Sequence, residues 1–521
     1  MTERSDKDLT QNINEFDIPQ ELLEAAFEEL PPENVVAASN PSSIGMGRII
    51  AGIALSGITL NIFALNHILP TIGAILLVLG FRNLRSENAW FKTAYICSIL
   101  RLVITIPLLI LNATVYSELL QGNVGKTVLY TSCGIQMIMI FAFWRAINKI
   151  SKKAGIEGKS FSAGALLIWY SLIYVAVVIG FNGTIAAIVM VISFIMIIIN
   201  LVSISNLMAT NGYLVTASPV KINDDVLRKI LLGIIILAIA IGYTFFSSYK
   251  MNWTLVDTNA FSNQEIYEKL ISLGYPEEQL KDLSLHELEL LKDADCVVAE
   301  TDEKPLNSGI EKTEYYEDGG KQIYTEYPVK ELKMTHVAVR IAGDGKNGEL
   351  WRVIHHFSLD DTLKVNGTEN LQLWGMESMK GWNGTYDLSG RVLCNNKGTD
   401  VTADYKFIGK QSYLTKDFFG QQQSACNCMC DFSMPRKATS RRGYVAYTSK
   451  QVENGYLLNA WINYTHQVGF VQYPVKTANL FAQEGMHLRD YPFILAQSAL
   501  QVYIKDGKPF IESEEGFPNG D

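Results

Sequence analysis

Hydrophobic residues are concentrated between residues 48 and 250, where long apolar runs alternate with short polar connections. A helix needs about 20 largely apolar residues to cross the hydrocarbon of a membrane. The run at 49–79 is too long for one helix and contains Asn66, His67 and Pro70, so it predicts two short helices joined near this polar stretch. One further helix is predicted in each of five runs, for a total of seven transmembrane helices, at residues 91–111, 127–144, 163–180, 184–205 and 230–246.

The positions of Lys and Arg predict how these helices are oriented, because cytoplasmic loops carry the excess of positive charge. Twelve basic residues fall in loops and helix ends on one predicted side, and only Lys126 and Lys250 fall on the other. This distribution places the N-terminus in the cytoplasm and residues 251–521 outside it. The polar residues 1–47 do not have the layout of a cleavable signal peptide. We therefore expect a multi-pass plasma-membrane protein with an extracytoplasmic C-terminal half.

Charge differs between the parts of the chain. Residues 1–47 carry a net charge of −8 and residues 48–250 a net charge of +10, which leaves −11 for residues 251–521. Neither acidic part has the basic surface that nucleic-acid binding requires, so the lipid bilayer and a protein or envelope component are the expected partners.

The acidic tail contains one predicted amphipathic helix, in the stretch "FDIPQELLEAAFEELPP". Its acidic polar face would be repelled by anionic lipid head groups, so docking on a protein or on the molecule's own basic loops is expected. The alternative is a partly formed, solvated helix. The residues predicted to dock are Leu22, Leu23, Phe27 and Leu30.

Arg101 is the only charged residue predicted near the middle of a membrane helix. Intramembrane charges often mark function, and this one suits an anionic lipid or substrate group. The alternative is a structural role, in which the guanidinium bonds backbone carbonyls and holds the bundle together. None of the five acidic residues in 48–250 falls inside a predicted span, so the carboxylate relay of an ion-coupled carrier is missing.

Beyond the membrane, the pattern first predicts a small helical module at residues 251–296, with two capping boxes, Ser262 with Glu265 and Ser284 with Glu287. Residues 297–321 are polar and predict a linker. From residue 322 the period changes to two, and Asn-Gly turns separate alternating strands, as in "HVAVRIAGDGKNGELWRVIHHFSL". The expected fold of residues 322–521, the β domain, is an all-β sandwich or jelly-roll.

Three cysteines two residues apart, Cys426, Cys428 and Cys430, would share one face of a strand and lie too far apart for unstrained bonds to each other. Cys394 is the natural disulfide partner. We expect a buried strand face with at most one or two disulfides. A thiolate cluster binding zinc or copper and redox chemistry are the alternatives, and no other cofactor is expected.

Histidines of the β domain offer a weaker metal hypothesis. His355 and His356 are adjacent and would point to opposite faces of a strand, so only one of them could bind zinc together with His336 or His466. No arrangement of Ser, His and Asp in the sequence defines a catalytic site, so an enzyme is not the expected class.

Two stretches, "NHILPTIGAILLVLGFRNLRSENAWF" and "LISLGYPEEQLKDLSLHELELL", resemble uncharacterised multi-pass proteins of Gram-positive bacteria that have an extracytoplasmic C-terminal domain. The resemblance implies a bacterial plasma membrane and brings no activity with it. The function expected from the whole chain is that of a non-enzymatic receptor or envelope-associated binding or signalling protein. The alternative is a transporter or lipid-processing component that uses Arg101, with the external domain as a lid.

Overall fold

The computed structural model forms two compact bodies, one made of Met1–Leu109 with Leu120–Leu237 and the other of Ile110–Leu119 with Ala238–Asp521. The predicted docking helix with Leu22, Leu23, Phe27 and Leu30 lies outside the described residues. The structure describes residues 41–511 except 58–64, 157–160, 182, 211–217, 219, 258–262, 317–319, 342–349, 375–385, 417–421, 451–457, 471, 485–488, 491 and 506–507.

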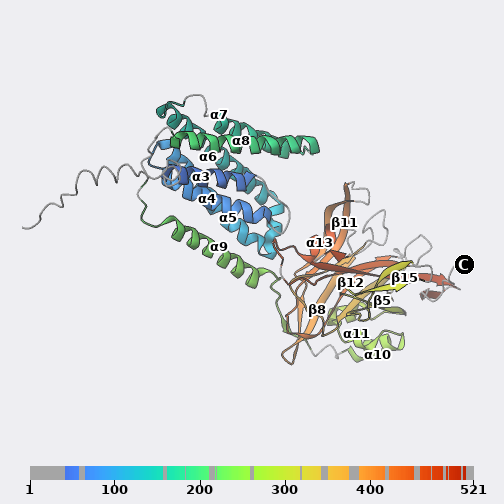
Figure 1. Cartoon of the computed structure of the whole chain (residues 1–521). Helices are drawn as coiled ribbons and strands as arrows, with labels where there is room; N and C mark the ends of the chain where they lie inside the picture. Colours follow the sequence, from blue (N-terminus) through green and yellow to red (C-terminus); the bar gives the residue numbers. More distant parts are fainter. Residues whose placement is uncertain are drawn as a thin grey trace, which may run out of the picture. The chain divides into compact units, whose positions relative to one another are not determined.

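Six of the described helices are long and apolar enough to cross a membrane, which is compatible with a multi-pass membrane protein (Figure 1). A shorter apolar helix, α3 (Pro41–Gly57), precedes them. A 3-10 turn, η1 (Val115–Gln121), follows the second long helix. The six are α4 (Leu65–Leu84), α5 (Ala89–Asn112), α6 (Asn123–Lys153), α7 (Phe161–Val178), α8 (Thr184–Thr210) and α9 (Asp224–Phe246).

The predicted position of the junction between the first two helices is wrong. Asn66, His67 and Pro70 were expected at a turn, but all three lie in the first two turns of α4. Proline is tolerated near a helix start, because few backbone hydrogen bonds are lost there. The polar residues therefore belong to the beginning of a helix and do not separate two helices.

Glycines allow α3 and α4 to approach each other at backbone distance. A Cβ atom added at Gly52 would lie 2.8 Å from the carbonyl oxygen of Gly73, and one added at Gly73 would lie 2.7 Å from that of Gly52. Two helical turns further along α4, a Cβ at Gly80 would lie 2.7 Å from the Gly45 carbonyl oxygen. Small residues at matching positions are the usual means by which membrane helices pack closely.

One end of the helical body carries a cluster of charged side chains. Asp224, at the start of α9, pairs with Arg48 in the middle of α3 and with Arg82 near the end of α4, the latter at 3.2 Å. Lys153, at the end of α6, pairs with Glu87 between α4 and α5 at 3.2 Å. The ends of α4 and α6, the start of α9 and the loop between α4 and α5 therefore lie on the same side of the body.

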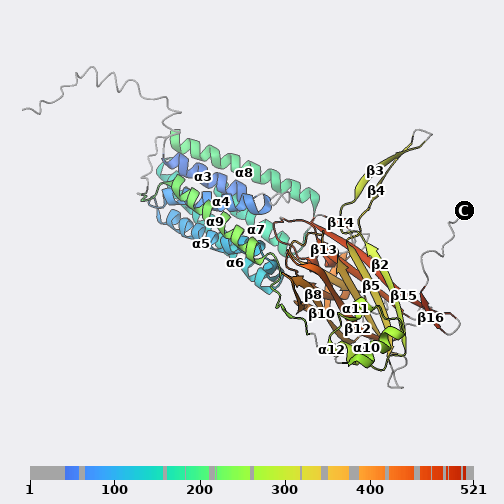
Figure 2. The same cartoon turned by 90° about the horizontal axis from the view of Figure 1, so that it is seen from below.

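The β domain contains two large antiparallel sheets and one separate hairpin, and it begins before the predicted boundary at residue 322, because three of its strands lie between residues 254 and 315 (Figure 2). In pairing order the first sheet consists of β1 (Thr254–Leu255), β9 (Thr399–Asp404), β8 (Tyr386–Asn396), β12 (Thr439–Lys450), β6 (Leu350–Leu359), β5 (Leu332–Ile341) and β2 (Cys296–Lys304). The second consists of β10 (Phe407–Lys416), β11 (Gln422–Phe432), β7 (Glu369–Leu373), β13 (Leu458–Gln467), β15 (Phe493–Lys505) and β14 (Arg489–Asp490), with β16 (Lys508–Ile511) paired to β15. The hairpin pairs β3 (Ile310–Tyr315) with β4 (Lys321–Glu326).

The two large sheets share one hydrophobic core. Val353 and Tyr447 contribute from the first sheet, and Leu371 and Tyr464 from the second, all fully buried. Because side chains alternate along a strand, the intervening residues face away from this core. The opposite face of the second sheet is covered in part by α13 (Ala478–Glu484), whose Phe481 stacks on Phe493.

The helical module packs on the outer face of the first sheet and is part of the β domain's structure. It contains α10 (Gln264–Ser272), α11 (Glu277–Leu280) and α12 (Leu285–Leu290). Leucines of the module bury against Val337, Ile354 and Tyr444 of the sheet. The capping box of Ser284 and Glu287 is only half formed. The backbone N–H of Glu287 donates to Ser284 Oγ at 3.2 Å, but the Glu287 side chain pairs with Arg352. Ser262 of the other predicted box lies outside the described residues.

The predicted linker at 297–321 is wrong, because it contains most of β2 and all of β3. β2 pairs with β5 along its whole length and forms an edge of the first sheet. Val298 packs on the shared core and Ala299 on the helical module, so both faces of β2 contribute to packing. The linker was predicted because β2 contains several acidic residues. Charged residues are, however, common on edge strands.

A Gly73→Ala substitution tests the close contact between α3 and α4. The added methyl group would also lie 2.4 Å from Ser56 Oγ, so the helices must separate, and we expect the free energy of unfolding to fall by roughly 1–3 kcal/mol. The control is Gly134→Ala in α6, where nothing lies within 4 Å of the added atom. Thermal unfolding of the full-length protein in detergent measures both. Equal melting temperatures for the two variants would contradict the close contact.

Candidate functional site

A buried ion pair attaches the helical module to the first sheet. Arg352 on β6 donates from Nε to Glu287 Oε1 at 2.5 Å and from Nη2 to Oε2 at 2.8 Å, and both side chains are inaccessible to solvent. Ser389 and Thr448 add hydrogen bonds to the same network. A bidentate pair of this kind fixes orientation as well as distance.

Two further arginines hold the chain between α11 and α12. Arg391 donates to the carbonyl oxygens of Asp282 and Leu283 at 2.8–3.1 Å. Arg442 on β12 donates from Nε to Asp282 Oδ1 at 2.8 Å. Burial raises the pKa of Asp282, and the neighbouring Arg442 opposes that shift. Asp282 is therefore fixed from both its backbone and its side chain.

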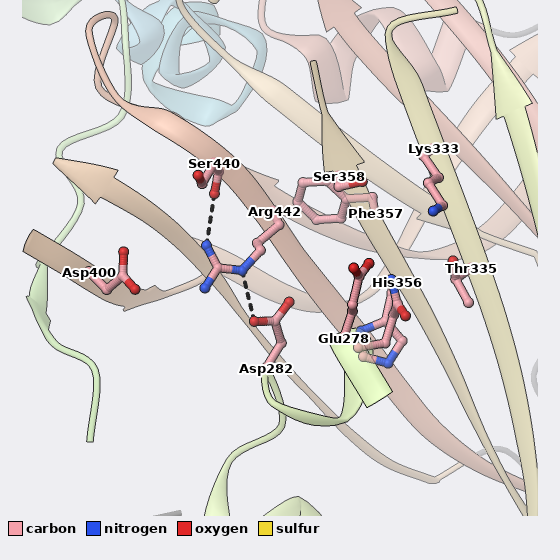
Figure 3. Close-up of a pocket in the computed structure, with 11 residues that line it drawn as sticks. Glu278, Asp282, Lys333, Thr335, His356, Phe357, Ser358, Asp400, Ser440 and Arg442 are labelled. Carbon is pink, nitrogen blue, oxygen red and sulfur yellow. Dashed lines mark hydrogen bonds and ion pairs between the residues drawn. The ribbon is translucent and has the colours of Figure 1, made fainter. Parts of the chain in front are cut away.

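A polar pocket of about 370 Å³, the module pocket, lies between the helical module and the first sheet (Figure 3). Lys333 and Thr335 lie on one side of the view and Arg442 with Asp282 on the other, with Glu278 between them (Figure 3). The remaining lining residues are Gln279, His356, Phe357, Ser358, Asp400 and Ser440.

His356 forms part of the pocket wall as a neutral imidazole. Burial, together with a smaller effect of the nearby His336, lowers its pKa to about 3. His356 Nε2 lies 2.8 Å from the hydroxyl of Tyr275, while Nδ1 is buried and has no hydrogen-bond partner among the described residues. A ligand group that forms a hydrogen bond with Nδ1 would satisfy this atom.

The chemistry of the module pocket favours binding a polar molecule. Its lining contains three carboxylates and two cations, and Phe357 is the only apolar side chain. Lys333 and Arg442 suit a carboxylate or another anionic group, and Glu278 and Asp400 suit amines and hydroxyls. Among the lining residues there is no Ser, Thr or Cys hydrogen-bonded to a histidine, which is the usual arrangement of an activated nucleophile.

A chain of hydrogen-bonded side chains lies in the shared core. It runs from Tyr447 through His355, His336 and Ser498 to Asp302. His355 Nδ1 and His336 Nδ1 are 2.7 Å apart, and His336 Nε2 is 2.7 Å from Ser498 Oγ. Ser498 donates to Asp302 Oδ2 at 2.9 Å, and the Tyr447 hydroxyl lies 3.4 Å from His355 Nε2. Asp302 pairs at the surface with Lys304 at 2.7 Å.

Hydrogen bonding assigns the tautomers along this chain. The single Ser498 proton goes to Asp302, so His336 Nε2–H donates to Ser498 and His336 Nδ1 accepts. His355 then donates from Nδ1 and accepts at Nε2. Burial lowers the pKa of His336 from 6.5 to about 4 and holds that of His355 well below 6.5, so both rings are neutral near pH 7.

A third polar cluster lies on the opposite face of the second sheet, beneath α13. Asp431 accepts hydrogen bonds from Asn370 and Asn479 at 2.7–2.9 Å. Burial raises the pKa of Asp431 to about 7, and the hydrogen bonds oppose this shift. The nearby Glu118 also has a raised pKa because of burial, and it accepts a hydrogen bond from Thr477. The sequence analysis missed this cluster, because alternating polar residues normally predict a solvated face.

The four cysteines proposed for a disulfide or metal site are free thiols in the structure. Cys428 and Cys430 are buried in the shared core, Cys394 is buried on β8, and Cys426 is exposed. Burial raises the pKa of Cys428 to about 12, that of Cys394 to about 11 and that of Cys430 well above 9, so these three thiols are protonated near pH 7. They pack as small apolar side chains.

The structure brings together only two of the histidines considered for zinc. His336 and His355 face each other in the core through a hydrogen bond that a metal ion would have to replace. His356 lies on the other face of β6, at the module pocket. His466 pairs with Glu369 on the second sheet at 2.9 Å.

Arg101 lies in the middle of α5 and is half-buried. Its Nη1 atom is inaccessible to solvent and has no hydrogen-bond partner among the described residues. The guanidinium interacts electrostatically with three ionisable side chains, Tyr170, Tyr174 and Cys133. These three come from α6 and α7, so the guanidinium is directed toward neighbouring helices of the same body.

Comparison with protein-family models finds none that matches this chain, and comparison with curated proteins finds no significant match. The site must therefore be interpreted from its own residues.

Replacing Glu287 with Gln tests the ion pair behind the module pocket. The variant leaves the buried Arg352 charge uncompensated, and we expect the free energy of unfolding of the β domain to fall by about 3–5 kcal/mol. The control is Glu277→Gln, which removes an exposed pair with Lys281 and should cost about 0–1 kcal/mol. Denaturant unfolding followed by tryptophan fluorescence separates the two. Similar losses would show that the buried pair has no special role.

The neutral histidines predict an acid-sensitive fold. A histidine whose folded-state pKa is depressed stabilises the protein above its unfolded pKa of 6.5, and this contribution is lost as the pH falls from 6.5 to about 4. For His336 the loss amounts to roughly 3 kcal/mol. We expect His336→Gln to show a smaller fall in stability between pH 7 and pH 4.5 than the unaltered protein.

The control for this measurement is His286→Gln, since His286 is exposed on α12. Asp431 works in the opposite direction, because a carboxyl group with a raised pKa loses its stabilising contribution as the pH rises from 3.8 to about 7. That contribution is common to all the proteins and cancels in the comparison. An unchanged pH dependence in His336→Gln would refute the assignment of a neutral, buried imidazole.

Proposed function

We propose that this protein is a non-enzymatic receptor or envelope-associated binding protein of a plasma membrane, and that the module pocket is its ligand site. The observation that carries the proposal is the module pocket itself, an open polar cavity whose walls are fixed by Asp282–Arg442 and by the buried pair behind it. The ligand is a small polar group of an envelope component or partner protein that carries an anionic group together with amines or hydroxyls.

The proposal includes seven transmembrane helices, with α3 as the first, a cytoplasmic N-terminus and an extracytoplasmic β domain. The cluster of Arg48, Arg82 and Asp224 supports this topology, since it places the end of α4 and the start of α9 on the same side. Positive charge marks that side as cytoplasmic. α9 begins there, so the chain that follows it emerges on the other side.

The two sheets and their shared core support a β-sandwich as the external fold, and a bacterial plasma membrane is the proposed location. In this proposal Cys428 and Cys430 contribute packing, and no cofactor takes part. The membrane helices anchor the receptor, and the acidic tail with Leu22, Leu23 and Phe27 provides the docking point for a cytoplasmic partner.

One observation favours the alternative, a transporter or lipid-processing component. Arg101 keeps a buried nitrogen atom without a described partner, as expected of a group that binds an anionic substrate. We prefer the receptor, because the lining of the module pocket offers several convergent polar groups, whereas the alternative relies on the single side chain of Arg101.

The test compares binding of an isolated cell-envelope fraction to the immobilised full-length protein in detergent. The double variant Lys333→Gln/Glu278→Gln changes two pocket groups that are not part of the structural pairs, and we expect it to retain at most about a tenth of the bound material. The control is Lys281→Gln/Glu289→Gln on the same module. Equal binding by both variants would contradict the module pocket as the ligand site.

A further inference from the structure

A second pocket, of about 260 Å³, lies where two connections between the large sheets meet, and we name it the basic pocket. One connection, residues 361–366, leads from β6 to β7, and the other, residues 436–439, leads from β11 to β12. Four cations and one carboxylate line it, giving a local net charge of +3 in an otherwise acidic part of the chain: Lys364, Arg436, Lys437, Arg441 and Asp361.

Arg441 is the unusual member of this set because its side chain is only 2% exposed. Its Nη2 donates to the carbonyl oxygen of Asp360 at 2.9 Å, but its buried Nε has no hydrogen-bond partner among the described residues. No carboxylate of the described part of the chain forms an ion pair with it. A buried guanidinium that lacks a counterion is costly, and a ligand oxygen would compensate for this cost.

The carboxylate in the basic pocket, Asp361, already accepts a hydrogen bond from the protein itself. Asp361 Oδ1 accepts a hydrogen bond from the backbone N–H of Ser440 at 2.7 Å, which ties the first connection to the start of β12. Arg441 and Arg442 are neighbours on β12 and therefore point to opposite faces. Arg442 reaches the module pocket, and Arg441 reaches the basic pocket.

The basic pocket lies near the end of the last candidate membrane span. The guanidinium of Arg436 lies 5.2 Å from the ring centre of Phe470, whose side chain is 53% exposed. Phe470 in turn contacts Tyr243, with ring centres 6.4 Å apart and a hydrogen bond from the Tyr243 hydroxyl to the Phe470 carbonyl oxygen. Tyr243 is in the final turn of α9, which ends at Phe246.

We propose that the basic pocket binds a phosphate group, which a lipid head group of the outer leaflet supplies. Arginine and lysine side chains that converge from two loops suit the tetrahedral oxygens of a phosphate, and aromatic residues such as Tyr243 and Phe470 are typical of the membrane interface. The head-group region extends only about 5–8 Å beyond the hydrocarbon, so a site beside the end of α9 lies within it. The lipid source rests on the proposed topology, whereas the phosphate chemistry does not.

The experiment uses the full-length protein in a neutral detergent and isothermal titration calorimetry. Three probes are titrated: inorganic phosphate, a short-chain phosphatidylglycerol, and a short-chain diacylglycerol that lacks phosphate. The triple variant Lys364→Gln/Arg436→Gln/Lys437→Gln removes exposed cations and leaves the buried Arg441 in place, so folding should be retained. The control triple, with the same change in charge, is Lys321→Gln/Lys330→Gln/Lys397→Gln.

We expect phosphatidylglycerol to bind about tenfold or more tightly than the diacylglycerol, and the pocket triple to lose about tenfold in affinity while the control triple does not. If inorganic phosphate shows this dependence and the lipid does not bind, the site takes a free phosphate and the lipid source is rejected. No binding of either phosphate probe, or an equal loss in both triples, overturns the proposal. Each of these results is independent of envelope binding at the module pocket.

Discussion

The ion pair between Arg352 and Glu287 is the interaction on which the outer half of the β domain depends. Two charges removed from water are costly to bury unless each finds a well-aligned partner, and the bidentate geometry provides this. Because the pair joins a strand to a helix, it also determines where the helical module lies on the first sheet. The module pocket exists only as a result of that placement.

Several features follow from covering both faces of a sheet. The inner face of the first sheet contributes to the shared core, and its outer face is covered by leucines of the helical module. Polar residues that alternation would place in solvent, such as His356, are buried instead. The same occurs on the second sheet, where Asp431 and Asn370 lie beneath α13. Polar side chains then bond one another, and the pKa values of the titratable ones shift.

Prediction from the sequence succeeded where one local signal determines the structure. Apolar length identified the six long apolar helices, and the Ser284 cap of α12 and the hairpin of β5 and β6 followed from short-range patterns. Prediction failed where the environment of a residue is determined by a segment far away in the sequence. The acidic β2 was read as a linker because its pairing with β5 lies about 35 residues away in the chain.

The candidate site was predicted less well than the fold, for the same reason. Nothing near Arg352 in the sequence indicates that Glu287 is its partner, and the alternating pattern of β6 does not show that a helix will cover the arginine. Similarly, the sequence could place His355 and His356 on opposite faces, but it could not show that His336 would meet His355. Long-range contacts of this kind are visible only in the folded chain.

The hydrogen-bonded side chains between Tyr447 and Asp302 give the core an electrical polarity. Every proton in the chain points toward the aspartate, so the bond dipoles add along one direction although each ring is neutral. Their positive ends favour the negative charge of Asp302 at the edge of the domain. Reversing any one of them requires all the others to turn, which makes the interior behave as a single oriented unit.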